Sequence, residues 1–339
     1  MDEIKLPIEI DPIIKSYHYA TFPMSIIQAN GGDRIIPWLC KKYINCCFDL
    51  RAVRNHFLIC LYDSYGVEDH VLNHQHICLA DYEYAELNID CVQLAQKMLS
   101  AGNYITGNYN EKYIPNKYSY NKHDYSHDYF LYGFDSRSEL FYSLGYTASE
   151  KLESFTIPFE NFRKSVELNT DKRIEFNFWK YNNENEYKLE LPDIIQDLED
   201  YCYSTNSKDG WKKYYVFGLT AMKMLCELFT DNKELDLRYT RAYLEHKYLM
   251  LTRLEYINKN TDCYLAQYLD EYENVYNKSK VIHNLCIKYH ITGSNTIIDS
   301  IAKLMNEILS YESLTLPNII SQLKDYNDVI TDQKQNDLH

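Results

Sequence analysis

The sequence SHDYFLYGFD at residues 126–135, followed by LFYSLGY at residues 140–146, has the pattern of a β-hairpin. Both segments are rich in Tyr and Phe, which favour strands. The sequence DSRS at residues 135–138 supplies residues typical of tight turns. The hairpin predicts an antiparallel sheet and places His127 at the start of its first strand. A histidine in this place is more often structural than catalytic, so a role as general base is one of two interpretations.

Short strands and helices on both sides of the hairpin predict an α+β core up to about residue 185. Asp90 has the character of an N-cap before a helix at 92–100 that ends near Gly102. Another helix begins at Phe22 and stops at the sequence NGG at 30–32. The remaining predicted elements are helices at 35–44 and 159–166 and strands at 56–62, 104–107, 154–158 and 174–180.

From about residue 190 onward the pattern is almost entirely helical. The predicted helices lie at 192–203, 211–228, 237–257, 264–291, 295–309 and 317–329. We therefore predict an α+β domain at residues 1–188, a helical domain at 189–330 and a frayed tail at 331–339.

The composition favours a globular protein that does not bind nucleic acid. Acidic residues outnumber basic ones by 49 to 35, whereas a nucleic-acid binder needs a basic face. The ten cysteines form no C-x-x-C pair, which is typical of free thiols in a reducing compartment. The N-terminus lacks a basic region followed by an apolar run, and no segment approaches the length of a membrane span. We expect a soluble, cytoplasmic protein.

Several other polar clusters receive structural interpretations. The segment HVLNHQH at residues 70–76 contains three histidines, but no carboxylate or thiolate at a suitable spacing accompanies them. No metal site is therefore predicted. No helix start precedes Cys46 and Cys47, so these cysteines are predicted to lie in the core. The sequence EHK at 245–247 lies on a long helix and predicts a solvated or interdomain face.

A cysteine acyl-transfer site would give His127 a catalytic partner. Such a site combines a thiol at a helix N-terminus, where its pKa is lowered, with an imidazole within hydrogen-bond reach. An acid or amide often fixes the imidazole tautomer. The first cysteine of the chain, Cys40, does not lie at the start of the first helix. The sequence thus leaves open an enzyme, a disabled enzyme or an enzyme whose nucleophile has been replaced.

Residues 97–146 resemble the N-terminal domain of the butirosin-biosynthesis H-type acyltransferases. The matching segments are MLSAGNYI at 98–105, YIP at 113–115 and HDYFLYGFD at 127–135. The chain is also similar to papain-like and bacteriocin-processing-type cysteine protease homologues of thiotemplated (nonribosomal) pathways. Within these it resembles the amide-forming homologues of closthioamide-type polythioamide pathways. The resemblance implies a papain-like cysteine protease core with an antiparallel sheet, followed by a helical C-terminal domain.

The resemblance also implies the positions of the site residues. The family's catalytic histidine falls on His127, and its cysteine falls within YHYATFPMS at 17–25, where this chain has none. Ala20 is the best candidate for the nucleophile position and Thr21 is the second. Either an engineered Cys→Ala replacement or natural loss of the nucleophile accounts for Ala20. We expect Thr21, Tyr125 and Tyr129 to contact the substrate.

The acid of the family's triad is also missing from its usual place. Many relatives carry an Asp on the return strand, near Gly145 or Tyr146, where this chain has no acidic residue. Asp128 is predicted to point to the opposite sheet face from His127, and Asp135 lies at the far end of the strand. We therefore predict a dyad rather than a triad.

These residues lead to one function and two alternatives. The resemblance implies an amide synthetase, in which a phosphopantetheine thioester of an acyl or peptidyl carrier protein acylates a cysteine at position 20. His127 would deprotonate this thiol and then a small-molecule amine, whose attack releases the amide. No metal or further cofactor is expected. The alternatives are a non-catalytic binding protein of the same fold, with Ala20 native, and a cysteine peptidase.

Overall fold

The computed structural model describes residues 2–51, 57–59, 71–171, 173–208, 213–232 and 236–336. The chain forms two compact units. The first unit comprises Met1–Gly32 and Gly66–Asn185, and the second comprises Asp33–Tyr65 and Glu186–His339. The chain passes between the units three times, and the last passage, between Asn185 and Glu186, lies near the predicted boundary at residue 188. The sequence did not indicate that residues 33–65 belong with the helical part.

The first unit contains an antiparallel sheet, which has seven strands within the described residues. Its order is β4-β9-β5-β6-β7-β8, and β1 pairs with the end of β6 beyond β5. Gly133 allows this crowded pairing, because a Cβ there would lie 2.3 Å from the Ile4 carbonyl oxygen. The strands are β1 (Glu3–Lys5), β4 (Leu72–Ala80), β5 (Tyr104–Asn110), β6 (Ser126–Asp135), β7 (Leu140–Tyr146), β8 (Leu152–Pro158) and β9 (Arg173–Tyr181).

The hairpin prediction is confirmed as β6 and β7, and the helix capped by Asp90 is confirmed as α4. The Asp90 side chain accepts hydrogen bonds from the backbone N–H groups of Val92 and Gln93. Strand β4 lies in the histidine-rich segment, for which the sequence predicted neither a strand nor a metal site. The helices of this unit are α1 (His18–Gly31), α3 (Asp81–Glu86), α4 (Cys91–Ser100), α5 (Phe159–Glu167) and the short 3-10 helix η3 (Glu111–Tyr113).

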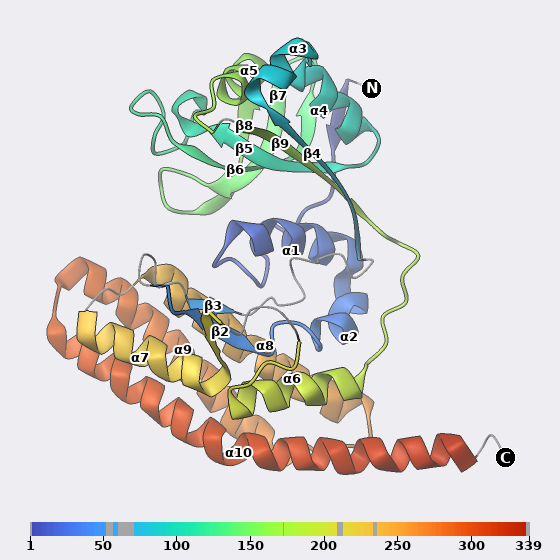
Figure 1. The fold of residues 1–339 in the computed structure, drawn as a ribbon, viewed down its shortest axis with the longest axis vertical. Coiled ribbons are helices and arrows are strands. Elements are labelled where there is room, and N and C mark those ends of the chain that lie inside the picture. The colour runs from blue at the N-terminus through green and yellow to red at the C-terminus, as the bar shows by residue number, and fades with distance from the viewer. Residues whose placement is uncertain are drawn as a thin grey trace. The chain divides into compact units, whose positions relative to one another are not determined.

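Helices cover both faces of the sheet (Figure 1). The main core lies on one face, where Leu99 of α4 and Phe162 of α5 pack with Tyr129 of β6. Helix α1 packs on the other face, where the Phe22 ring stacks on Phe130 with centroids 5.2 Å apart. This helix begins at His18, four residues before the predicted start. Its N-cap, Tyr17, makes no side-chain capping hydrogen bond, so the sequence carried no start signal there.

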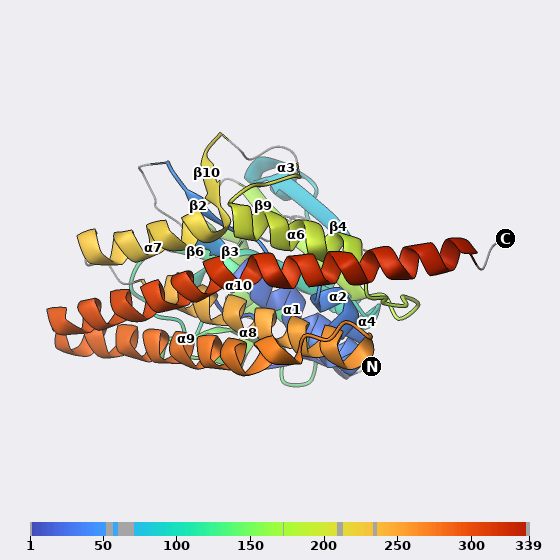
Figure 2. The ribbon, with the colours of Figure 1, turned by 90° about the horizontal axis from the view of Figure 1, so that it is seen from below.

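The second unit is mainly helical, with a small antiparallel sheet of order β10-β2-β3. Its strands are β2 (Cys46–Asp49), β3 (Phe57–Ile59) and β10 (Tyr215–Phe217). Its helical elements are η1 (Gly32–Ile35), α2 (Ile36–Leu39), α6 (Leu191–Tyr203), α7 (Gly218–Asn232), α8 (Leu237–Asn260), α9 (Ala266–Thr292) and α10 (Asn295–Asn336). Helices α9 and α10 lie side by side (Figure 2).

Four expectations for the second unit are wrong in detail. The helices predicted at 295–309 and 317–329 are one helix, α10, which continues through Pro317 and on to Asn336. The tail predicted from 331 is therefore helical as far as it is described. The helix predicted at 211–228 is strand β10 followed by α7, and the helix predicted at 35–44 ends at Leu39. Among the described residues, no helix is long and apolar enough to cross a membrane.

Buried polar groups of α8 bind the segment that follows α2. Arg253 is fully buried and donates hydrogen bonds to the carbonyl oxygens of Cys40 and Lys42. His246 Nε2 lies 2.8 Å from the Ile44 carbonyl oxygen. These bonds satisfy a non-helical backbone inside the protein, which explains why residues 33–65 belong to the second unit. The prediction of a solvated face at 245–247 is wrong, since all three residues are buried and contact Arg241, Ile44, Tyr201 and Glu312 of the second unit.

A fully buried ion pair connects three helices of the second unit. Lys247 Nζ of α8 lies 2.7 Å from Glu312 Oε2 of α10, and both side chains are completely buried. The Tyr201 hydroxyl of α6 donates to the same carboxylate at 2.8 Å and accepts from Lys247 at 2.7 Å. Each charge thus keeps several polar contacts that replace water.

Replacing Lys247 with Met should destabilise the protein by about 3–5 kcal/mol, because the Glu312 charge would remain buried without its partner. Adding Glu312→Leu should restore at least half of the loss. Urea unfolding measures the free energy of unfolding of the single and the double variant. Lys324→Met is a matched control on α10, because it removes an exposed ion pair with Glu199 and should cost less than about 1 kcal/mol. Equal losses of stability in Lys247→Met and Lys324→Met would contradict the stabilising role of the buried ion pair.

Candidate functional site

His127 lies where β6 begins, beside the end of β5. It pairs across the strands with Tyr109, and Glu111 follows two residues later, after Asn110 caps the 3-10 helix η3. His127 Nδ1 lies 3.2 Å from Glu111 Oε1. The Tyr125 ring stacks on the imidazole with centroids 5.3 Å apart. The structure therefore places a carboxylate beside one ring nitrogen of His127, at a contact distance whose angles do not form a hydrogen bond.

Glu111 is held between two basic side chains. Burial favours its neutral form, but His127 and Lys117 outweigh burial and hold the pKa of Glu111 below its usual value. Lys117 Nζ lies 3.4 Å from Glu111 Oε1 and donates a 2.7 Å hydrogen bond to the Tyr146 carbonyl oxygen. Burial lowers the pKa of Lys117, and the attraction of Glu111 opposes this. Glu111 is thus a carboxylate at neutral pH, able to orient His127.

His18, the first residue of α1, forms the other side of the site. Its ring meets the His127 ring edge-on, with centroids 4.8 Å apart, and stacks on Phe22 and Tyr146 at 4.9 and 5.5 Å. Burial lowers its pKa to about 3, and the positive charges of His127 and Lys117 add to the effect. His18 is therefore neutral over the physiological range.

The expected nucleophile position does not face His127. Ala20 follows His18 by two residues, so it lies about 200° further around the helix, and it is only 2% exposed. The α1 side chain in contact with His127 is His18. Thr21 is completely buried, and its hydroxyl donates to the Tyr17 carbonyl oxygen at 2.8 Å. The expectation that Thr21 contacts substrate is therefore wrong.

The two predicted tyrosines have different environments. Tyr125 is 47% exposed and lies on the His127 ring, so it borders the imidazole. Tyr129 is 1% exposed and packs in the core against Tyr109 and Phe162. Tyr129 therefore cannot line a substrate site, and its expected role is wrong.

Sequence reasoning missed Glu111, the acid that contacts His127. The family pattern directed attention to the return strand, whereas Glu111 begins the 3-10 helix η3 directly after β5. The pairing of Tyr109 with His127 brings Glu111 near the imidazole, and this pairing of strands cannot be read from the sequence. Asp128 also borders His18, with its Oδ2 3.8 Å from His18 Nδ1. Burial raises the pKa of Asp128, Glu175 adds to the rise, and His127 and Lys117 oppose it.

The described cysteines of the first unit do not supply a reactive thiol at this site. Cys91 begins α4, but it is buried in the core on the sheet face opposite α1, and burial raises its pKa to about 11. Cys78 lies on β4, near His76 and Glu175. His70 and Cys60 lie outside the described residues. Cys46 and Cys47 are buried in β2, as expected for core residues.

No family model matches the chain, and no curated protein matches it.

The burial of neutral His18 should make stability fall as the pH falls. Below about pH 6.5 the unfolded chain takes up a proton at position 18 that the folded chain does not bind until about pH 3. His18→Phe removes this effect and keeps the ring contacts. Relative to the variant, the free energy of unfolding of the wild-type protein should fall by about 1.4 kcal/mol per pH unit below 6.5, or by about 2 kcal/mol at pH 5. Urea unfolding at pH 7.5, 6 and 5 measures the difference in the free energy of unfolding between the two proteins. A difference that does not change with pH would contradict the expected effect of His18.

Proposed function

We propose that the first unit transfers an acyl group from a carrier-bound thioester to an amine, with His127 as general base and Glu111 as the residue that orients it. The 3.2 Å contact between Glu111 Oε1 and His127 Nδ1 carries this proposal. A carboxylate beside Nδ1 leaves Nε2 to exchange a proton with the substrate. The His127 side chain is 32% exposed, so a substrate can reach it.

The acceptor amine is itself the nucleophile in this proposal, because α1 presents an imidazole rather than a thiol to His127. The amine nitrogen attacks the thioester carbonyl carbon, and His127 Nε2 accepts the amine proton. The C–N bond forms, the C–S bond breaks, and the proton passes to the departing thiolate. The products are an amide and a free thiol, so no oxidant, reductant or metal is required.

The charges and rings around His127 support this role. Glu111 is ionised at neutral pH and can stabilise the imidazolium that forms during the reaction. Neutral His18 adds no positive charge that would oppose protonation of His127. The half-exposed Tyr125 ring provides an apolar surface beside the imidazole. This surface suits an acyl chain or a pantetheine arm.

A non-catalytic binding protein of the same fold is the second candidate. The lack of a thiol in the first turn of α1 favours it, because relatives are expected to carry their nucleophile there. A cysteine restored at position 20 would distinguish a covalent route from both candidates.

The test supplies the full-length protein with an acyl thioester of N-acetylcysteamine, which mimics pantetheine, and a panel of primary amines. Mass spectrometry should detect an amide, while the intact protein should carry no acyl adduct. His127→Ala should slow amide formation by about 10²–10⁴-fold, and Glu111→Gln should lower kcat more than it changes KM. His123→Ala is a matched control in the preceding loop, where His123 contacts Ser119, and should keep the wild-type rate.

Amide formation that is equal in wild-type protein and His127→Ala would exclude the general base. If only Ala20→Cys formed the amide, through an acyl adduct on the protein, direct transfer would fail and the covalent route would stand. If neither protein formed an amide but both bound the thioester, the binding candidate would replace catalysis.

A further inference from the structure

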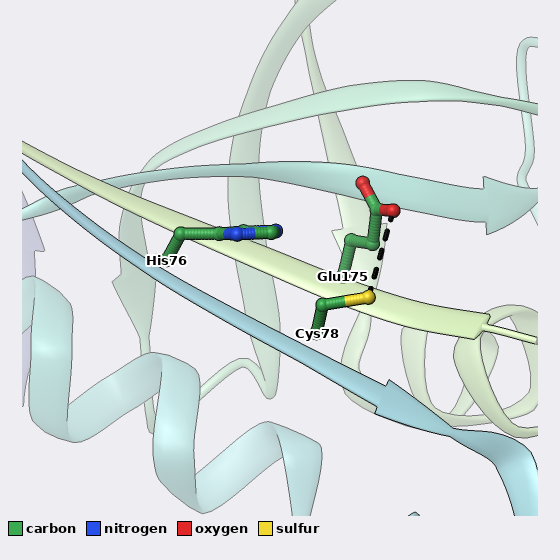
Figure 3. A group of neighbouring side chains, drawn as sticks. All are labelled: His76, Cys78 and Glu175. Atoms are coloured by element: carbon green, nitrogen blue, oxygen red, sulfur yellow. Dashed lines mark hydrogen bonds between the residues drawn. The ribbon is translucent and has the colours of Figure 1, made fainter.

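We propose that His76, Cys78 and Glu175 form an open binding site for a divalent zinc ion on the first unit. Their ligand atoms, one from each side chain, all lie within 4.8 Å of one another. His76 and Cys78 come from β4, and Glu175 comes from β9 (Figure 3). The proposal does not depend on the proposed acyl transfer.

Strand geometry brings these residues together. His76 and Cys78 are two residues apart on β4, so their side chains share one face of the sheet. Cys78 pairs directly with Glu175 across the strands, and its thiol points at the carboxylate, with Sγ 3.8 Å from Oε1. The site is therefore built on paired strands rather than on a loop, which fixes the positions of the three Cα atoms.

The kinds of ligand select the metal. Zinc binds thiolate, imidazole and carboxylate with bonds of about 2.0–2.3 Å, which at tetrahedral angles place ligand atoms about 3.3–3.7 Å apart. Small side-chain rotations would bring the present atoms to that spacing. Ca²⁺ and Mg²⁺ prefer oxygen ligands throughout, so the thiolate and imidazole argue against them. A thiolate and a carboxylate also balance the charge of a divalent ion, and binding would release the thiol proton to solvent.

Exposure leaves the fourth position open. His76 and Cys78 are exposed and Glu175 is half-buried, so water or a small ligand can complete the tetrahedron. Three protein ligands with an open position are typical of reactive zinc sites, whereas structural sites use four. The site should therefore bind zinc reversibly, without being required for folding.

His74 also lies on this face but is engaged elsewhere. Its ring stacks on Trp179 with centroids 3.9 Å apart, and its Nε2 lies 2.9 Å from Asn177 Oδ1. These contacts make His76 the imidazole available to a metal. His74 is thus a matched control, since it is a histidine on the same strand and face.

Cobalt(II) titration of the full-length protein tests the site, because a cobalt–thiolate bond gives a near-ultraviolet charge-transfer absorption. The wild-type protein should show this band at one cobalt per chain, and zinc should displace it. Cys78→Ser should abolish the band. His76→Ala and Glu175→Gln should each weaken cobalt binding at least about tenfold, the smallest loss typical of a metal site deprived of a supporting group.

His74→Gln and Cys202→Ser should bind cobalt as the wild-type protein does, and far-ultraviolet circular dichroism checks that each variant is folded. A wild-type protein without the band would overturn the proposal, as would a band that persists in Cys78→Ser. A band that needs Cys78 but is unaffected in both His76→Ala and Glu175→Gln would indicate a single thiolate ligand. That result would also overturn the three-residue site.

Discussion

Strand β6 is hydrogen-bonded along both edges, and this pairing determines how the first unit is built. The register that places Tyr109 opposite His127 also places Glu111 within reach of the imidazole. Alternation along β6 then directs Tyr129 into the core beneath α4 and α5 and Phe130 toward α1. A shift of one residue would exchange these faces, separating His127 from Glu111 and exposing the core tyrosine.

Burial gives the polar groups of the two units different properties. In the second unit, Lys247 and Glu312 are both withdrawn from water and contact each other directly, so their charges serve to hold α8 and α10. In the first unit, Glu111 and Lys117 are also buried, but their partner His127 is partly exposed. A charge network that ends at an exposed imidazole can influence proton exchange with a bound molecule. A network that is closed on every side can only contribute to structure.

The sequence predicted the elements whose signals are local. The hairpin at 126–146, the helix capped by Asp90 and most of the later helices follow from strand alternation, capping residues and helical periodicity. The start of α1 was missed because Tyr17 gives no capping signal, and the union of two helices into α10 was missed because Pro317 usually ends a helix. Glu111 and the Cys78–Glu175 pair depend on which strands are neighbours, and a single sequence does not specify that. The membership of residues 33–65 in the second unit depends on buried hydrogen bonds from α8, about 200 positions away.

The proposed metal site and the His127 site are related electrostatically through a row of polar side chains that ends at Asp128, next to His127 in the chain. Strand alternation places Cys78, Glu175, Asn108 and Asp128 on the face covered by α1, in neighbouring strands from β4 to β6. The row influences Asp128, because burial raises the pKa of Asp128 and the charge of Glu175 adds to this rise. A divalent ion bound by Glu175 would offset that charge and favour ionised Asp128, which faces His18. Occupancy at the edge of the sheet would therefore alter the electrostatic field around the histidine pair without a change in the backbone.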